Sequence, residues 1–286
     1  MMSSIPYDVI HAVLEDALFK SLYEFLLLHG GQQFLLLPAP HSEERVTSLL
    51  DIACGSGAWA CHIARRYPDL DIVGINKSLA CVKAAQMWAA VRGLENATFL
   101  QKDLLQISSQ ERRYDVVRGH VIFYAIPPEA HQSLLNELVR VCTPGGTVFL
   151  KEWNISQTNS EACYQWLYTL RQAAIRAGYS PDFIYGMANR LKLAGCASVD
   201  QSLETLDVSS GSSAHKTLCE SIISIFDLTG LFLLQQKVLT QEQLRDLRTR
   251  IMIEILADTF EWKWSLITWV GHKPANPPLT QDHMSV

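Results

Sequence analysis

The sequence predicts an α/β fold: a mostly parallel sheet of seven strands, with helices on both faces and an antiparallel last strand. Near-continuous apolar runs alternate with helical patterns from residue 46 to about residue 155. Strands that are buried on both faces of a parallel sheet give such runs. Two further strand patterns, at 197–208 and 260–274, come late in the chain and are separated by a helical stretch. They add a hairpin to the same sheet, and their connection forms a lid.

Residues 1–44 precede this alternation and predict an N-terminal helical cap. Apolar residues between positions 5 and 29 recur at helical spacing. The proline-containing stretch 37–44 (LPAPHSEE) then ends the segment.

Residues 45–155 predict the central unit, in which strands and helices take turns. The strands fall at 46–53, 71–75, 97–104, 113–123 and 147–153, and the helices at 55–68, 78–94 and 129–142. Residues 156–286 predict helical lid segments, at 156–194 and 214–259, plus the two C-terminal strands. Because these strands join the same sheet, we expect one integrated domain.

Composition narrows the class of protein. The 286 residues are 48% hydrophobic, enough for a large core, and carry a net charge of −5. Nucleic-acid binding requires a basic face, and no block of like charges occurs, so we expect neither a nucleic-acid nor a membrane partner. The seven cysteines are scattered without ligand spacing, which predicts reduced thiols in a cytoplasmic protein and no metal site. The chain is expected to be a monomer or a homodimer.

Residues 49–60 (LLDIACGSGAWA) carry the strongest signal of a binding site. A buried strand delivers Asp51, and Gly55 and Gly57 then allow a tight turn into a helix. Glycines at such a turn let backbone amides approach a ligand that side chains would block.

Several companions of this turn make the pattern more specific. They are the strand ends IVGIN (72–76) and QKDL (101–104), the unit LVRVCTPGGTVFLKEW (138–153) and the final WVGHKP (269–274). Together the chain resembles the class I S-adenosylmethionine (SAM)-dependent methyltransferases, closely over 46–155 and more loosely over the terminal strands. The order of parts is similar to the branch that acts on small molecules, including those of secondary metabolism. The resemblance implies a Rossmann-like fold, a SAM-dependent methyltransferase activity, SAM as cofactor and a small-molecule substrate.

The resemblance also implies which residues bind the cofactor. Asp51 orients the methionine end through the turn, and Asp103 with the Leu104 amide contacts the adenine edge. Arg118 and Gly119 close the strand beside the methionine. The full set is Asp51, Ala53, Gly55, Gly57, Asn76, Lys77, Asp103, Leu104, Arg118 and Gly119.

Asn76 departs from the family, which prefers an acid for the ribose diol at this position. Charged hydrogen bonds contribute about 1.5–3 kcal/mol and neutral ones about 0.5–1.5, so the amide weakens cofactor binding about tenfold. An uncharged residue before Lys77, with G-x-G-x-x-A upstream, also fits an NADP-dependent oxidoreductase. A methyltransferase-like fold that uses SAM for other chemistry, such as cyclisation, is a further alternative.

The acceptor side is expected just beyond the fourth and fifth strands. His120 is the candidate base or acceptor-orienting group, with Tyr124 and Glu152 as further catalytic candidates. Leu-, Phe- and Trp-rich segments predict an apolar or aromatic acceptor. The methylated atom, whether O, N, C or S, is left open by the sequence.

Overall fold

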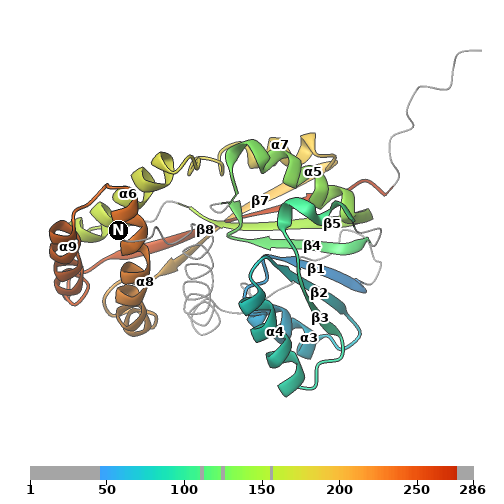
Figure 1. Ribbon diagram of the computed structural model, residues 1–286, viewed down its shortest axis with the longest axis horizontal. Helices are drawn as coiled ribbons and strands as arrows, with labels where there is room; N and C mark the ends of the chain where they lie inside the picture. Colours follow the sequence, from blue (N-terminus) through green and yellow to red (C-terminus); the bar gives the residue numbers. More distant parts are fainter. Residues whose placement is uncertain (1–45, 110–112, 124–125, 155–156, 276–286) are drawn as a thin grey trace, which may run out of the picture.

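The computed structural model describes residues 46–109, 113–123, 126–154 and 157–275. The cap expected at 1–44 and the candidate Tyr124 lie outside these residues. Figure 1 shows a central sheet with helices on its two faces and a group of helices at one end.

The sheet confirms the predicted α/β class. Its strands follow the order β3-β2-β1-β4-β5-β8, and β7 pairs with the other side of β8. The strands are β1 (Ser48–Ile52), β2 (Asp71–Asn76), β3 (Ala97–Gln101), β4 (Tyr114–His120), β5 (Cys142–Trp153), β7 (Ser198–Asp207) and β8 (Trp262–His272). The first five are parallel, and β8 runs antiparallel to β5 and β7. A two-residue strand, β6 (Gln157–Thr158), is the one addition to the seven predicted strands.

The two faces of the sheet bury alternate residues of each strand. Leu49 packs with α3 (Ala58–Arg66) and α4 (Leu79–Val91), whereas Leu50 packs with α5 (His131–Val141) and α7 (Met187–Leu193). Directly paired residues share a face. Asp51, Arg118, His120 and Lys151 therefore lie on the α3–α4 side, called the Arg118 face, and Glu152 lies on the other side, called the Glu152 face.

A second core lies at the far end of the β7–β8 hairpin. It is formed by α6 (Glu161–Arg176), α8 (His215–Gln235), α9 (Gln241–Glu254) and the adjoining ends of β7 and β8, and it is called the helical lobe (Figure 1). Two helical expectations were too long. The stretch 156–194 splits into α6 and α7 around Gly178 and Gly186, both at positive φ. The stretch 214–259 splits because Lys237 takes φ 54° and Thr240 restarts the chain with a capping box.

Other boundaries shift where turns intervene. β5 starts at Cys142, five residues before the predicted start at Thr147, because Tyr114 pairs with Cys142 before the register shifts to Val116 and Thr147. The third strand ends at Gln101, and a 3-10 helix, η3 (Leu104–Ser109), follows it.

One helix in the described part of the chain, α8, has the length and hydropathy of a membrane span. Its buried residues, among them Leu218, Ile222 and Phe226, pack into the helical lobe, as in a core helix.

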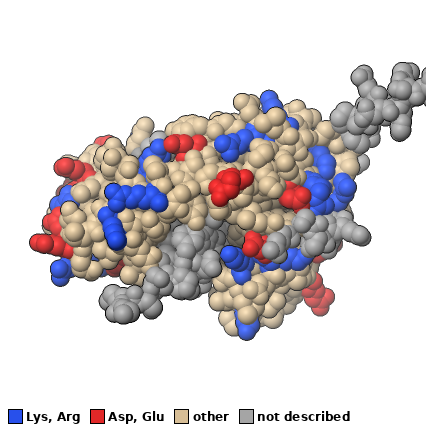
Figure 2. Space-filling view, turned by 45° about the horizontal axis from the view of Figure 1, so that its top comes forward, with Lys and Arg blue, Asp and Glu red and all other residues tan. Residues whose placement is uncertain are grey.

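On the face shown in Figure 2, charges of both signs are interspersed without a continuous basic field.

Candidate functional site

The turn after β1 places its two glycines for different reasons. Ala53, Gly55 and Gly57 all have positive φ, of 51°, 54° and 73°. A Cβ on Gly57 would lie 2.6 Å from the Ala85 Cβ, so this glycine lets α3 approach α4 and the sheet. A Cβ on Gly55 would meet no atom of the described residues within 4 Å. Among these residues Gly55 therefore borders open space, as the close approach of a ligand to the turn requires.

Asp51 and Arg118 form a buried ion pair beneath this turn. Arg118 Nη1 donates to Asp51 Oδ1 over 2.6 Å, and their side chains are 8% and 1% exposed. The guanidinium also lies 3.7 Å from the ring centroid of Trp59, the second residue of α3. Burial raises the pKa of the Asp51 carboxyl, and the Arg118 charge opposes that rise. The pair is thus held rigidly and adds no net charge to the site.

Asn76 ends β2 with its side chain already engaged. Its Oδ1 accepts from the Ser78 backbone N–H over 2.7 Å, and Ser78 Oγ accepts from Cys81 N–H to cap α4. The amide oxygen thus shapes the start of α4, which leaves the NH₂ group to meet a ligand. Lys77 beside it is exposed.

The remaining cofactor candidates follow the same edge of the sheet. Asp103 Oδ1 accepts from Leu105 N–H and caps η3, where Leu104 is 8% exposed. A Cβ on Gly119 would lie 2.9 Å from Ile122 Cδ1 and 3.1 Å from Leu150 Cδ2, so packing on the Glu152 face is what requires glycine there. These candidates lie at or near the carboxyl ends of four neighbouring strands: Asp103 after β3, Asn76 on β2, the turn after β1 and Arg118 on β4. Open α/β sheets bind ligands at this edge.

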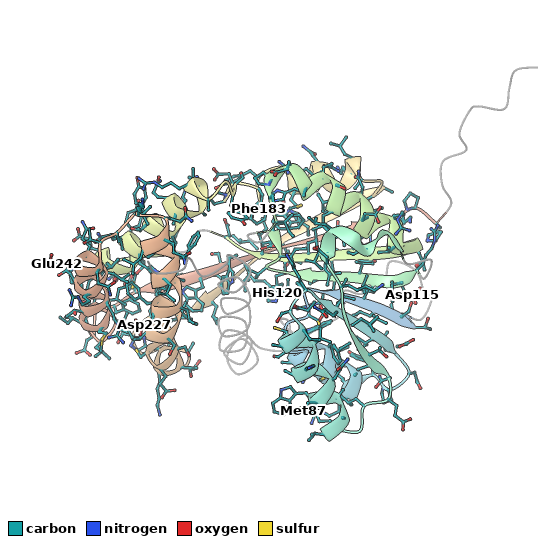
Figure 3. The ribbon with its side chains drawn as sticks, viewed as in Figure 1. Met87, Asp115, His120, Phe183, Asp227 and Glu242 are labelled. Carbon is teal, nitrogen blue, oxygen red and sulfur yellow. The ribbon has the colours of Figure 1, made fainter. Side chains whose placement is uncertain are left out.

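His120 ends β4 on the Arg118 face. In Figure 3 it lies near the middle of the molecule, between the Met87 side and the Asp227 side, and Asp115 lies at the opposite end of β4. Burial lowers the pKa of the imidazole well below its usual range, and the charges of Arg118 and Lys151 lower it further. His120 is therefore neutral at physiological pH and able to accept a proton or a hydrogen bond.

Glu152 does not join His120, because it lies on the opposite face of the sheet. Its Oε1 accepts from the backbone N–H groups of Ile122 and Phe123, over 2.8 and 3.2 Å. These residues follow Val121, a β-branched residue held at φ 54°. Burial raises the pKa of the Glu152 carboxyl to about 8. The visible role of Glu152 is to hold the chain that leaves β4.

Three polar residues on the Arg118 face were missed by sequence reasoning. Lys151 Nζ donates to Glu204 Oε2 over 2.9 Å, with side chains 4% and 23% exposed. Thr268, the β8 partner of Lys151, is 4% exposed, and its Oγ1 has no hydrogen-bond partner among the described residues. A lysine inside the apolar run TVFLKEW was a usable signal, whereas Glu204 and Thr268 carried none without the strand register.

Comparisons with known proteins agree with this geometry. Residues 49–146 match the family model of a methyltransferase domain. The ajmaline N-methyltransferase of Rauvolfia serpentina is 33% identical over 110 residues, which are 38% of this chain and 36% of that protein. The 2-heptyl-1-hydroxyquinolin-4(1H)-one methyltransferase of Mycobacteroides abscessus is 29% identical over 97 residues, 34% of this chain and 42% of that one. The match thus spans less than half the length of either relative.

A solved O-methyltransferase family protein from Burkholderia thailandensis shares the fold, with a TM-score of 0.54 at 12% identity over 90% of this chain and 59% of that one. The parallel sheet is Rossmann-like, and residues 49–146, which include the glycine turn, are similar to a methyltransferase domain. The relatives that this part of the chain resembles are methyltransferases.

Proposed function

We propose that this protein transfers a methyl group from SAM to a small acceptor with an apolar or aromatic body. The observation that carries the proposal is the open space at Gly55, bordered by a left-handed turn and lying above the buried Asp51–Arg118 pair. The residues fit SAM: Ala53, Gly55 and Gly57 would hold its amino-acid end, Asn76 its ribose and Asp103 its adenine edge. SAM supplies an electrophilic methyl group on a sulfonium.

The chain's own residues position the methyl donor and the acceptor. Arg118, fixed by Asp51 and Trp59, sets the wall beside the methionine end without bringing net charge near a cation. Neutral His120 orients the acceptor or takes its proton where the nucleophile must lose one. The indole rings of Trp153 and Trp264 pack edge to face, with centroids 5.3 Å apart. These rings belong to the core of the helical lobe, and the heptyl-quinolinone that names one relative is what supports an aromatic or apolar acceptor.

The decisive test is ligand-induced stabilisation. S-adenosylhomocysteine (SAH) should raise the melting temperature of the purified protein, and NADPH should not. Stabilisation by NADPH alone would sink the proposal in favour of an oxidoreductase. Methyl transfer is distinguished from SAM-assisted cyclisation by mass spectrometry, since only transfer adds a methyl group to the product and releases SAH. His120→Ala should leave the SAH dissociation constant near wild type and reduce turnover at least about a hundredfold.

We further propose that the protein acts in the cytoplasm as a monomer or homodimer. The seven cysteines are all free in the structure, which supports a reducing compartment.

A further inference from the structure

A row of polar side chains crosses four strands on the Arg118 face. The register pairs His120 of β4 with Lys151 of β5, Lys151 with Thr268 of β8, and Thr268 with Ser202 of β7. Glu204, two residues beyond Ser202 on the same face, reaches across β8 to Lys151 over 2.9 Å. The first residue of the row, His120, directly follows Gly119, the last of the residues assigned to the cofactor. The row therefore lies beyond the cofactor residues, on the side where the acceptor is expected.

Within this row the Thr268 hydroxyl is buried at a cost in free energy that no hydrogen bond to a described residue offsets. A buried ion pair is weak evidence for stability, because desolvation offsets its attraction. Burial lowers the pKa of the Lys151 ammonium, and Glu204 opposes this effect. The Thr268 hydroxyl is buried, and no described residue bonds its oxygen. A buried hydroxyl without a partner is unfavourable, so a ligand that forms a hydrogen bond with Thr268 Oγ1 would gain from a group already in place.

The charges decide which chemical group fits. Lys151 offers donors, Glu204 offers an acceptor, and Thr268 offers either, while the Lys151–Glu204 pair carries no net charge. A neutral hydroxyl group can accept from Lys151 and donate to Glu204 at once. A carboxylate or phosphate would face the Glu204 carboxylate and bring an uncompensated charge. The Glu204 side chain is 23% exposed, whereas that of Lys151 is 4% exposed, so the pair can be reached from solvent on its Glu204 side.

Beyond Lys151 the same face runs into the apolar core of the helical lobe. Trp153 lies two residues beyond Lys151 on the same face, and its ring packs against that of Trp264. Trp262 follows Trp264 with ring centroids 5.4 Å apart. The Trp262 Nε1 is buried and has no bond to any described residue. The polar group thus stands where the Arg118 face meets the apolar core of the helical lobe.

We propose that Lys151, Glu204 and Thr268 form a subsite that binds a neutral hydroxyl group, phenolic or alcoholic, on the apolar acceptor. The proposal rests on the proposed methyl-transfer function and names the class of substrate that the same site takes. The subsite recognises the acceptor and is distinct from the residues that hold the methyl donor.

The test uses matched probe pairs on the full chain saturated with SAH. The pairs are 1-naphthol with naphthalene and 4-phenylphenol with biphenyl, and each carboxylate analogue, 1-naphthoate or biphenyl-4-carboxylate, forms a third arm. Ligand-observed NMR titration measures the dissociation constants. At least one hydroxylated probe should bind about tenfold or more tightly than its deoxy partner, and more tightly than its carboxylate.

The variant Lys151→Met/Glu204→Leu separates recognition from structure. Replacing a buried pair by apolar groups is often neutral or stabilising, so the melting temperature and the SAH affinity should stay near wild type. The hydroxyl preference, which is the dissociation constant of the deoxy probe divided by that of its hydroxylated partner, should fall to about one. Thr268→Val, which removes only the hydroxyl, should reduce the hydroxyl preference several-fold. This variant provides the test if the double variant does not fold. Lys216→Met, in an exposed pair on α8, should keep the wild-type preference.

The outcomes are distinguishable. If wild-type protein fails to bind SAH, the proposed function fails. If SAH binds but no hydroxylated probe exceeds its deoxy partner, the subsite is wrong while the methyltransferase assignment stands. A preference that survives in Lys151→Met/Glu204→Leu also overturns the subsite, and tighter binding of the carboxylates overturns the assignment to a neutral hydroxyl.

Discussion

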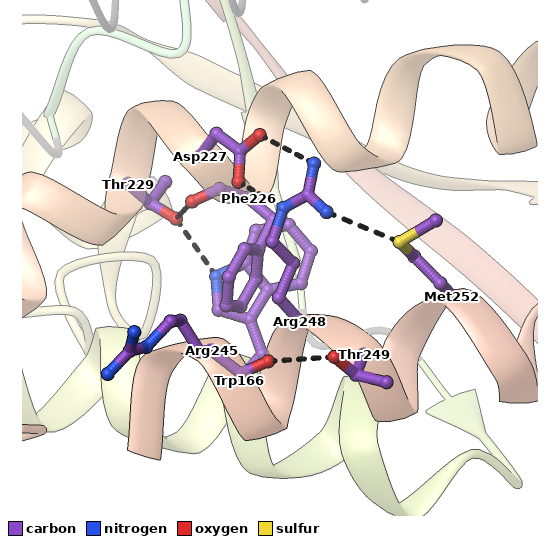
Figure 4. A network of polar contacts seen from close by, with 8 residues as sticks. All are labelled: Trp166, Phe226, Asp227, Thr229, Arg245, Arg248, Thr249 and Met252. Atoms are coloured by element: carbon purple, nitrogen blue, oxygen red, sulfur yellow. Dashed lines mark hydrogen bonds and ion pairs between the residues drawn. The ribbon is translucent and has the colours of Figure 1, made fainter. Parts of the chain in front are cut away.

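The Arg118 face and the helical lobe use buried side chains in different ways. The Arg118 face buries ion pairs, Asp51 with Arg118 and Lys151 with Glu204, beside a turn of residues at positive φ. The helical lobe buries an apolar core with a few neutral polar contacts between its helices, such as Trp166 Nε1 donating to Thr229 Oγ1 over 3.0 Å. Its charged pairs, such as Arg248 with Asp227, are more exposed (Figure 4). The difference indicates that the face is organised for binding and the lobe for support.

The largest expected effect is on the stability of the lobe. Phe226→Ala should destabilise the protein by about 3–5 kcal/mol, because Phe226 is fully buried and its ring lies 5.5 Å from that of Trp166. The SAH dissociation constant of the folded protein should change less than about twofold. Urea unfolding and calorimetry measure the two quantities. Leu231→Ala, at an exposed site of the same helix, is the control and should cost little. A large loss of SAH affinity in Phe226→Ala would mean that the lobe shapes the cofactor site directly.

The two glycines of the turn should respond differently to substitution: a change at Gly57 should mainly lower stability, and a change at Gly55 should mainly weaken SAH binding. Gly57→Ala should cost about 2–5 kcal/mol of stability, from left-handed strain and from overlap with Ala85. Gly55→Ala should cost only about 1–2 kcal/mol of strain but weaken SAH binding more than about tenfold, since its methyl group enters the open space.

Gly178→Ala is the matched control for this pair. Gly178 also has positive φ and open space around a Cβ, and it follows α6, away from the turn. It should show the strain of Gly55→Ala with unchanged SAH affinity. Equal affinity in Gly55→Ala and Gly178→Ala would remove the open space at Gly55 as the reason for assigning a cofactor to this turn.

A buried carboxyl near the site also predicts that the stability of the protein depends on pH. The pKa of Glu152 rises from 4.5 to about 8 on folding. A carboxyl with a raised pKa binds its proton more tightly in the folded state. Its stabilising contribution is therefore complete below pH 4.5 and is lost as the pH rises toward about 8.

Glu152→Gln should remove this dependence. The wild-type free energy of unfolding should fall by up to about 1.4 kcal/mol per pH unit in that window relative to the variant, with no further divergence above it. Urea titrations at a series of pH values measure the difference, and Glu95→Gln, at an exposed site, should parallel wild type. Parallel curves for Glu152→Gln and wild type would show that Glu152 stays ionised throughout.

The same contrast explains what the sequence could predict. Asp51, Gly55 and Gly57 stand in one local motif, and the apolar periodicity of the strands determines the sheet, so the turn and the sheet were both predictable. The Arg118–Trp59 contact and the Lys151–Glu204 pair join residues far apart in the chain and depend on register, which no local pattern specifies. Glu152 lies on the other face of the sheet from His120 because His120 pairs with Lys151, and the next residue along the strand points to the opposite face. The helices of the lobe were merged because Lys237 at positive φ is not a glycine and gave no stop signal.

The smallest expected effect concerns Asn76, where the Arg118 face departs from the methyltransferases that the chain resembles. Asn76 Oδ1 is occupied by the Ser78 N–H, so the amide can offer a ribose only its NH₂ group. In Asn76→Asp one carboxylate oxygen keeps the Ser78 bond, and the other accepts from the ribose diol. The gain of a charged hydrogen bond over a neutral one, about 1 kcal/mol, should tighten SAH binding about five- to tenfold. Asn136→Asp makes the same change of net charge on α5 and should leave the affinity unchanged. Weaker binding in Asn76→Asp would mean that Asn76 and Lys77 recognise something other than a diol.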